Sequence, residues 1–145
     1  MGTSWSLQAV SPPGDAGRGV QAALDRVVAQ MSQWEPASDL SRFNRAPPDI
    51  WHDVPPDLAH VVEAALEIAR SSGGAFDAGL GRLTDAWGFG SAGPVDRAPD
   101  AGSGPASRSI DFDSKTRCVR RGEDTALDLS GIAKGYGVDL AAEWL

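Results

Sequence analysis

The sequence predicts an α+β domain, in which several helices pack with a small number of strands. Two segments carry apolar residues at steps of three and four, as one buried helix face requires, whereas shorter segments alternate apolar and polar residues as half-buried strands do. The 145 residues fit one domain or part of one, and a hydrophobic content of 41% is enough for a packed core.

The first third of the chain predicts one strand and two helical segments. Residues 3–10 alternate as a half-buried strand, which the run Pro12-Pro13-Gly14 ends. From Val20 onward the apolar residues fall on one helix face, at Leu24, Val27, Val28, Met31 and Trp34. Residues 38–44 begin with good N-capping residues and predict a short helix or turn.

The middle of the chain predicts one long helix and one short one. Residues 47–56 carry prolines at both ends and predict an extended connector. A helix beginning at Asp57 presents an apolar stripe made of Leu58, Val61, Val62, Ala65, Leu66 and Ala69, and Gly73-Gly74 closes it as a C-cap. A short helix is expected over residues 80–87.

The last third predicts a hairpin followed by a strand and a helix. Residues 91–107 are rich in glycine and proline and predict a surface loop inside one domain. Residues 109–113 and 117–121 predict a hairpin, and residues 125–129 predict a further strand. A helix begins near Ala133, and because it reaches the last residue without a C-cap, we expect the chain to be a fragment.

Composition excludes several classes of protein. With 20 acidic and 13 basic residues, the net charge of −7 offers no basic stripe for a dedicated nucleic-acid-binding protein. The single cysteine, Cys118, excludes an internal disulfide and a cysteine-based zinc site. No run approaches the roughly 20 apolar residues of a membrane span, and no charged segment followed by an apolar core predicts a secretion signal.

The sharpest local motif is Asp128-Leu129-Ser130-Gly131-Ile132-Ala133-Lys134-Gly135-Tyr136-Gly137. It places a carboxylate at a strand end, then glycines and Lys134 on the first turn of a helix, where free amides favour anions such as phosphate. Asp128 could also accept hydrogen bonds from a ligand or support a bound metal. The alternative is an ordinary strand-to-helix turn capped by Asp128 or Ser130. It is not a Walker P-loop, because the required spacing is absent.

A second motif follows the long helix, at Gly73-Gly74-Ala75-Phe76-Asp77. Phe76 could pack on a ligand ring and Asp77 could hydrogen-bond it, or Phe76 could belong to the core behind a Schellman helix end. Residues 88–93 match G-x-G-x-x-G only formally, because no strand precedes them and Pro94 follows where a helix should begin. His52 and His60 are expected on the solvated surface.

Taken together, separate segments of the chain resemble the ApbE family of flavin transferases. The segments that carry this resemblance are Met1-Gly2-Thr3-Ser4-Trp5, Ser38-Asp39-Leu40-Ser41-Arg42-Phe43-Asn44, the run from Gly73 to Asp77 with Leu80-Gly81, Trp87-Gly88-Phe89-Gly90, and the stretch from Leu127 to Tyr136. Each is weak alone, but their joint occurrence in this order is highly specific. The resemblance implies that residues 1–145 are the N-terminal part of a single ApbE/T-fold-like α+β domain, truncated after its first half.

The resemblance also implies an activity. Family enzymes take FAD as substrate with Mg²⁺, move the FMN part onto a threonine or serine hydroxyl of a target flavoprotein, and release AMP. The targets are typically subunits of redox complexes such as the Na⁺-translocating NADH:quinone reductase (Nqr) and its Rnf relatives. Members are commonly periplasmic lipoproteins, although no lipobox is visible here. Catalytic residues, and further metal ligands, are expected in the second half of the domain, beyond residue 145.

Specific positions take their expected roles from this resemblance. The positions that match flavin- or FAD-binding residues are Met1, Trp34, Ala75, Phe76, Asp77, Asp128 and Lys134. Gly131 falls where the family places a magnesium ligand, and a glycine can offer a hard cation only its backbone carbonyl. Two other functions stay open: hydrolysis of FAD to FMN and AMP by a pyrophosphatase, and a non-catalytic flavin-binding module.

Overall fold

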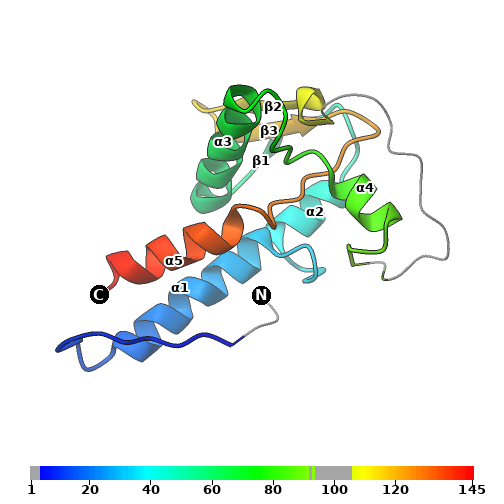
Figure 1. Cartoon of the computed structure of the whole chain (residues 1–145). Helices are drawn as coiled ribbons and strands as arrows, with labels where there is room; N and C mark the ends of the chain where they lie inside the picture. Colours follow the sequence, from blue (N-terminus) through cyan, green and yellow to red (C-terminus); the bar gives the residue numbers. More distant parts are fainter. Residues whose placement is uncertain (1–3, 92, 94–105) are drawn as a thin grey trace.

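The computed structural model of the chain describes residues 4–91, 93 and 106–145. It contains helices and a small antiparallel sheet, which confirms the predicted α+β class (Figure 1). The elements in chain order are α1 (Ala16–Met31), α2 (Asp39–Arg45), β1 (His52–Asp53), α3 (Pro56–Ser71), α4 (Gly81–Ala86), the 3-10 turn η1 (Ala106–Ser109), β2 (Ile110–Asp113), β3 (Cys118–Arg121) and α5 (Ala133–Glu143).

The three strands pair in the order β1-β3-β2, with both pairings antiparallel. The predicted hairpin is confirmed, because Ile110 pairs with Arg121 and Asp113 pairs with Cys118. Its turn is closed by the Asp113 carboxylate, which accepts hydrogen bonds from the Lys115 N–H and the Thr116 hydroxyl, both at 2.9 Å. The predicted connector contains the two-residue strand β1, which the flanking prolines keep short.

Helix α3 follows its predicted span and ends as predicted. The Gly74 N–H donates to Ala69 O at 2.9 Å and the Gly73 N–H donates to Arg70 O at 3.2 Å, which is the bonding pattern of a Schellman motif. Both glycines have positive φ angles, of 63° and 89°, in the left-handed region. The turn therefore redirects the chain sharply toward residues 75–79.

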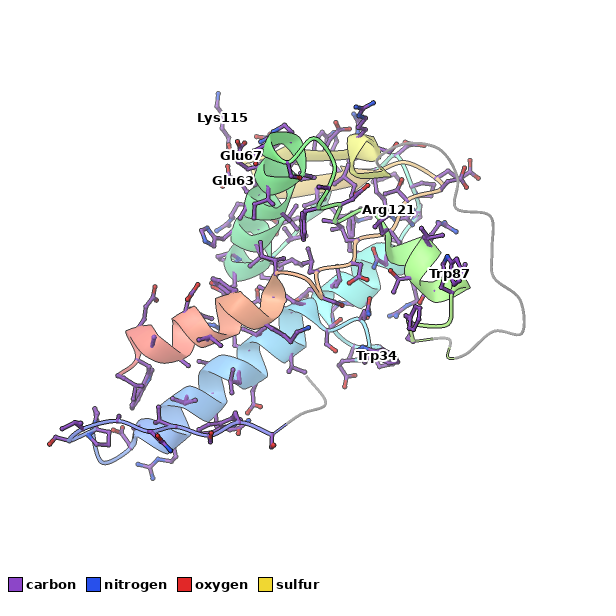
Figure 2. All side chains as sticks on the ribbon, viewed as in Figure 1. Trp34, Glu63, Glu67, Trp87, Lys115 and Arg121 are labelled. Atoms are coloured by element: carbon purple, nitrogen blue, oxygen red, sulfur yellow. The ribbon has the colours of Figure 1, made fainter. Side chains whose placement is uncertain are left out.

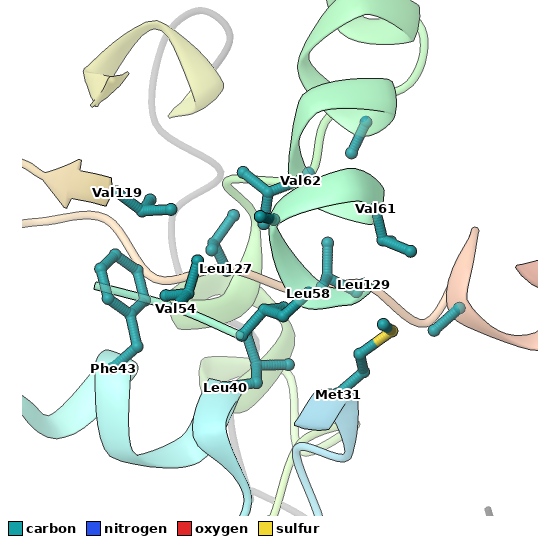
Figure 3. Packing of buried hydrophobic residues seen from close by; sticks show 14 of the residues in the cluster. Met31, Leu40, Phe43, Val54, Leu58, Val61, Val62, Val119, Leu127 and Leu129 are labelled. Carbon is teal, nitrogen blue, oxygen red and sulfur yellow. The ribbon is translucent and has the colours of Figure 1, made fainter. Parts of the chain in front are cut away.

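One hydrophobic core joins the helices to the sheet (Figure 3). The predicted stripe of α3 faces it, together with side chains from the end of α1, from α2, from β3 and from the segment before α5. The labelled members are Met31, Leu40, Phe43, Val54, Leu58, Val61, Val62, Val119, Leu127 and Leu129. Residues as far apart in the sequence as Val27 and Ala133 thus share one core.

Helices α1 and α5 lie side by side below the core (Figure 1). Gly19 of α1 makes room for the Trp144 indole, because a Cβ atom at residue 19 would lie 1.9 Å from Trp144 Cε2. A polar network links the pair to α3: the Tyr136 hydroxyl donates to Asp57 Oδ1 at 2.9 Å, and Arg26 Nε lies 2.7 Å from Asp57 Oδ2. Asp57 therefore ties three helices together.

This network predicts a loss of stability at alkaline pH. Burial and the hydrogen bond to Asp57 raise the pKa of Tyr136 to about 12. Since tyrosine in an unfolded chain titrates near pH ~10, the folded protein binds this proton more tightly, and stability should fall as the pH rises from about 10 to about 12. The stability gap between wild type and Tyr136→Phe should be constant below that range and shrink within it.

Urea unfolding of both proteins across this pH range measures the gap. Because Tyr136 is the chain's single tyrosine, tyrosinate absorbance follows its titration without interference from another tyrosine. Unfolding curves that keep a constant separation up to pH 12 would contradict the role given to the Asp57 hydrogen bond.

Two predicted strands are wrong. Residues 4–10 of the first one run exposed beside α1, and the Trp5 indole donates to Gln21 Oε1 at 3.0 Å. Nothing else in the described part of the chain pairs with them as a strand, and alternation without a partner makes no sheet. Residues 125–129 form only an isolated bridge between Ala126 and Leu80, because their backbone groups bond a side chain and a loop instead.

Other boundaries differ in smaller ways. Helix α1 begins four residues before Val20 and ends at Met31, so Trp34 lies beyond it. The short helices predicted over residues 38–44 and 80–87 are confirmed as α2 and α4. The predicted loop at residues 91–107 falls mostly outside the described residues. Among the helices that the structure describes, none is long and apolar enough to cross a membrane.

Candidate functional site

The centre of the site is the extended segment that leads from β3 into α5. At Leu127 it pairs with the side chain of Asn44, the next-to-last residue of α2. Asn44 Nδ2 donates to Leu127 O at 2.8 Å, and the Leu127 N–H donates to Asn44 Oδ1 at 2.8 Å. The amide therefore satisfies both backbone groups of a buried residue, as a neighbouring strand would.

A loop borders the same segment through backbone hydrogen bonds. The Asp128 N–H donates to Ala78 O at 2.8 Å, and the Gly81 N–H donates to Ala126 O at 2.9 Å. At Gly81 the two backbones approach so closely that a Cβ atom there would lie 2.8 Å from Ala126 O. Glycine is required at this contact, and the segment is bonded to α2 through Asn44 and to residues 78–81 through its backbone.

Arg121 fixes the beginning of the segment from within the protein (Figure 2). Only 4% of this residue is exposed. Its guanidinium donates to Thr125 O at 3.1 Å, Asn44 O at 3.0 Å and Ala46 O at 2.6 Å, with a longer bond to the Gly122 carbonyl. Burial, followed by the nearby charge of Arg82, lowers the pKa of Arg121 below its ordinary value. A buried cation thus joins the end of α2 to residues 122–125.

Asp128 follows Leu127, and both oxygens of its carboxylate accept hydrogen bonds. We call Asn44, Thr84 and Arg121, which hold residues 121–128 in place, the frame of the site. The Thr84 hydroxyl of α4 donates to Oδ2 at 2.9 Å, and the Ser130 N–H donates to Oδ1 at 2.9 Å. The second bond is the turn-capping role that the sequence offered as an alternative. Each carboxylate oxygen keeps a further lone pair, so the half-buried group can also accept a donor from a ligand.

The Phe76 segment lies against the same turn. A Cβ atom at Gly131 would lie 3.0 Å from Phe76 Cε2, so the ring edge lies against one side of this glycine. Phe76 is half-buried and packs against the core, which agrees in part with the core alternative. Asp77 Oδ1 accepts the Gly79 N–H at 2.8 Å, and Ala75 is exposed. The structure thus brings together the two motifs that the sequence singled out separately.

Lys134 and Gly131 occupy the exposed rim of the turn. Lys134 Nζ donates to Ser130 O at 2.8 Å, so its charge lies over the start of α5. Gly131 is exposed and could offer its carbonyl to a cation. The described ranges contain no cluster of three or more histidine, cysteine, aspartate or glutamate residues able to hold a metal.

Trp34 lies outside the helix that its spacing predicted. The Ser32 hydroxyl accepts the Trp34 and Glu35 N–H groups, both at 3.2 Å, in a turn just after α1. Trp34 is 61% exposed (Figure 2). It lines a hollow of about 260 Å³ that also borders Gly81, Ala126 and Leu127. Met1 lies outside the described residues.

Sequence reasoning missed three residues of the frame: Asn44, Thr84 and Arg121. Asn44 is the last residue of the segment from Ser38 to Asn44, which was noted only for its family resemblance. Its hydrogen-bond partner, Leu127, lies 83 residues further along the chain. A lone threonine in a short helix and an arginine in a strand carry no local pattern. Of the two histidines, His60 is exposed as predicted, whereas His52 is half-buried with its ring 5.7 Å from that of Phe43.

Comparison with known proteins agrees with this architecture. A model described as the ApbE family matches residues 1–145. The FAD:protein FMN transferase of Vibrio cholerae serotype O1 is 30% identical over all of this chain and 46% of its own length. The counterpart from Haemophilus influenzae is also 30% identical, over 87% of this chain and 39% of its own length. The chain thus spans less than half the length of these curated relatives.

Solved structures show the same likeness. The apo form of the Pseudomonas stutzeri flavinyl transferase ApbE superposes with a TM-score of 0.80 at 29% identity, covering 91% of this chain and 46% of that one. The flavin transferase ApbE from Vibrio cholerae gives a TM-score of 0.82 at 27% identity, covering 97% of this chain and 47% of that one.

Proposed function

Because the chain belongs to the ApbE family, we propose that this protein transfers the FMN part of FAD to a threonine or serine hydroxyl of a target protein. The relatives named FAD:protein FMN transferase support this proposal. The observation that carries it here is the convergence of residues 75–79, residues 128–131 and Lys134 on one exposed turn. That turn offers hydrogen-bond acceptors, a cation and an aromatic edge within one small area.

The reaction sets the tasks of these groups. The hydroxyl oxygen of the acceptor bonds to the phosphorus of the FMN phosphate, and the bond from that phosphorus to the bridging oxygen breaks. AMP leaves with that oxygen, and a base takes the hydroxyl proton. We assign Lys134 to the phosphate oxygens, Phe76, Asp77 and Asp128 to ligand contacts, and Trp34 to stacking on a flat ring. Ala75 and Met1 are assigned to flavin or FAD binding from the resemblance alone.

Dependence on Mg²⁺ is a second part of the proposal. A bound Mg²⁺ would shield the charge of the pyrophosphate. The resemblance assigns the Gly131 carbonyl to this ion, and the described residues bring together no group of three histidine, cysteine, aspartate or glutamate side chains that could hold it. Targets of the Nqr and Rnf type, with an acceptor threonine or serine, are likewise proposed from the resemblance alone.

A flavinylation assay tests the transfer. Incubation of the protein with FAD, Mg²⁺ and a target bearing an acceptor threonine should give a covalently fluorescent target band and one AMP per flavin attached. A target with this threonine changed to valine is the control and should stay dark. FMN and AMP appearing without a target would favour the pyrophosphatase alternative, and neither product appearing would contradict the enzyme proposal.

Replacing Lys134 should weaken FAD binding. Lys134→Ala removes a cation from the rim of the turn, and the Kd for FAD should rise about tenfold, since a charge-assisted bond to phosphate contributes ~1.5 kcal/mol. Calorimetric titration with FAD measures the change. The matched control is Lys115→Ala, which removes the chain's other lysine from the β2–β3 turn and should leave the Kd unchanged (Figure 2). Equal affinities for both variants would contradict the assignment.

A further inference from the structure

We infer that Thr84 and Asn44 are positioning residues that hold Asp128 in the orientation in which it binds FAD. The inference rests on the proposed function, because it takes Asp128 to be a ligand contact. Neither residue belongs to the contacts assigned above: Thr84 acts on the carboxylate of Asp128, and Asn44 acts on the backbone directly before it.

Thr84 controls the direction of the carboxylate. With the Ser130 N–H on Oδ1 and the Thr84 hydroxyl on Oδ2, both oxygens are held from different elements. Thr84 is itself fixed, because its N–H donates to Leu80 O at 2.8 Å in the first turn of α4. Without its hydroxyl the carboxylate would keep one bond and could rotate about its terminal torsion, which is a soft one. The lone pairs left for a ligand would then no longer point in one direction.

Asn44 controls the position from which that carboxylate starts. Its amide makes two bonds of 2.8 Å to Leu127, whose side chain belongs to the core. Asn44 cannot easily shift, because its own carbonyl accepts the buried Arg121 guanidinium at 3.0 Å. The Asp128 Cα therefore follows a residue whose backbone and side chain are both fixed. Loss of this amide would free the backbone on the α2 side while leaving the bonds to residues 78–81.

Three single variants test the Thr84 part. Thr84→Val removes the hydroxyl without changing the shape, and the Kd for FAD should rise about tenfold, as expected for a hydrogen bond to a charged group. Thr84→Ser restores the hydroxyl and should bring the Kd back to within about twofold of wild type. Thr116→Val is the matched control, because Thr116 makes the same 2.9 Å hydroxyl bond to Asp113 in the remote β2–β3 turn. Its Kd should equal that of wild type.

The Asn44 part needs a control for stability, because Asn44→Ala leaves two backbone groups of a buried residue unpaired. Val27→Ala supplies it, since Val27 is a core residue of α1 and takes no part in the hydrogen bonds that hold residues 126–128. Asn44→Ala should raise the Kd for FAD by tenfold or more and speed hydrogen exchange of the Leu127 amide. Val27→Ala should lower stability comparably and leave the Kd unchanged.

The outcomes separate the inference from the function beneath it. If wild type binds FAD and the Thr84 and Asn44 variants bind it equally well, positioning is overturned and the binding proposal stands. If Val27→Ala raises the Kd as much as Asn44→Ala does, the effect of Asn44 is general destabilisation, and its positioning role is overturned. If wild type does not bind FAD in the same titration, the proposed function fails first and the inference falls with it.

Discussion

Replacing Arg121 with methionine should lower the free energy of unfolding by about 3 kcal/mol, which is a large fraction of a small domain's stability. Methionine keeps the length and apolar stem of the side chain but donates no hydrogen bond. Three carbonyl oxygens, at Asn44, Ala46 and Thr125, would lose the Arg121 donor. The Gly122 carbonyl would keep only its bond from the Thr125 N–H. The loss is partly offset, because methionine also removes the cost of burying a cation.

The neighbouring arginine provides the comparison. Arg120 pairs with Asp111 at 2.8 Å and stacks on Trp51 with its guanidinium 4.9 Å from the ring centroid, both on the surface. Arg120→Met should therefore cost no more than about 1 kcal/mol. Urea unfolding of both variants measures the difference between their free energies of unfolding. The slope of this free energy against urea concentration should stay unchanged. Equal losses for the two variants would show that the buried bonds of Arg121 contribute nothing particular to stability.

The second large effect is expected at Gly81. Gly81→Ala places a methyl group 2.8 Å from Ala126 O and 3.0 Å from Ala126 C, both of which are backbone atoms that cannot rotate away. The start of α4 must then separate from the site segment, which strains or breaks the Gly81 N–H bond to Ala126. We expect a loss of about 2 kcal/mol or more, in the range of overpacked cores, together with weaker FAD binding.

A glycine in open space should respond in the opposite direction. Nothing lies within 4 Å of a Cβ atom at Gly17 in α1, and its backbone is helical. Gly17→Ala should therefore stabilise the protein by up to about 1 kcal/mol, because alanine is the better helix former. Thermal unfolding of Gly81→Ala and Gly17→Ala, each compared with wild type, measures whether stability falls in the first variant and rises in the second. A neutral Gly81→Ala would contradict the close approach of the two backbones.

The helices could be predicted well because their signals are local. The apolar stripe from Leu58 to Ala69 and the Gly73-Gly74 end predicted α3 almost to the residue. Ser38 predicted the start of α2, and its hydroxyl oxygen accepts the capping hydrogen bond from the Ser41 N–H. Trp34 continues the spacing of α1, yet the Ser32 hydroxyl turns the chain before that residue. Periodicity identifies a helix face but not the side chain that ends the helix.

The strands and the site frame could not be predicted because they depend on partners elsewhere. Residues 3–10 and residues 125–129 were both predicted as strands, and in the described part of the chain neither forms a strand of the sheet. Residues 125–129 pair at Leu127 with the side-chain amide of Asn44, and no pattern typical of strands reveals such a partner. The motif at residues 128–137 could be identified from the sequence, since glycines and a lysine at a helix start suggest an anion site. The residues that hold it in place, Asn44, Thr84 and Arg121, could not be identified in this way.

The pairing of Asn44 with Leu127 also bears on how the molecule folds. Its two members are separated by 83 residues, whereas the bonds within α1, α3 and α5 span only a few. Closing so long a loop costs chain entropy before any contact repays it, so such contacts form late in small domains. In a stopped-flow refolding experiment, helical circular dichroism should therefore return first, and the capacity to capture a dinucleotide should follow in a slower phase.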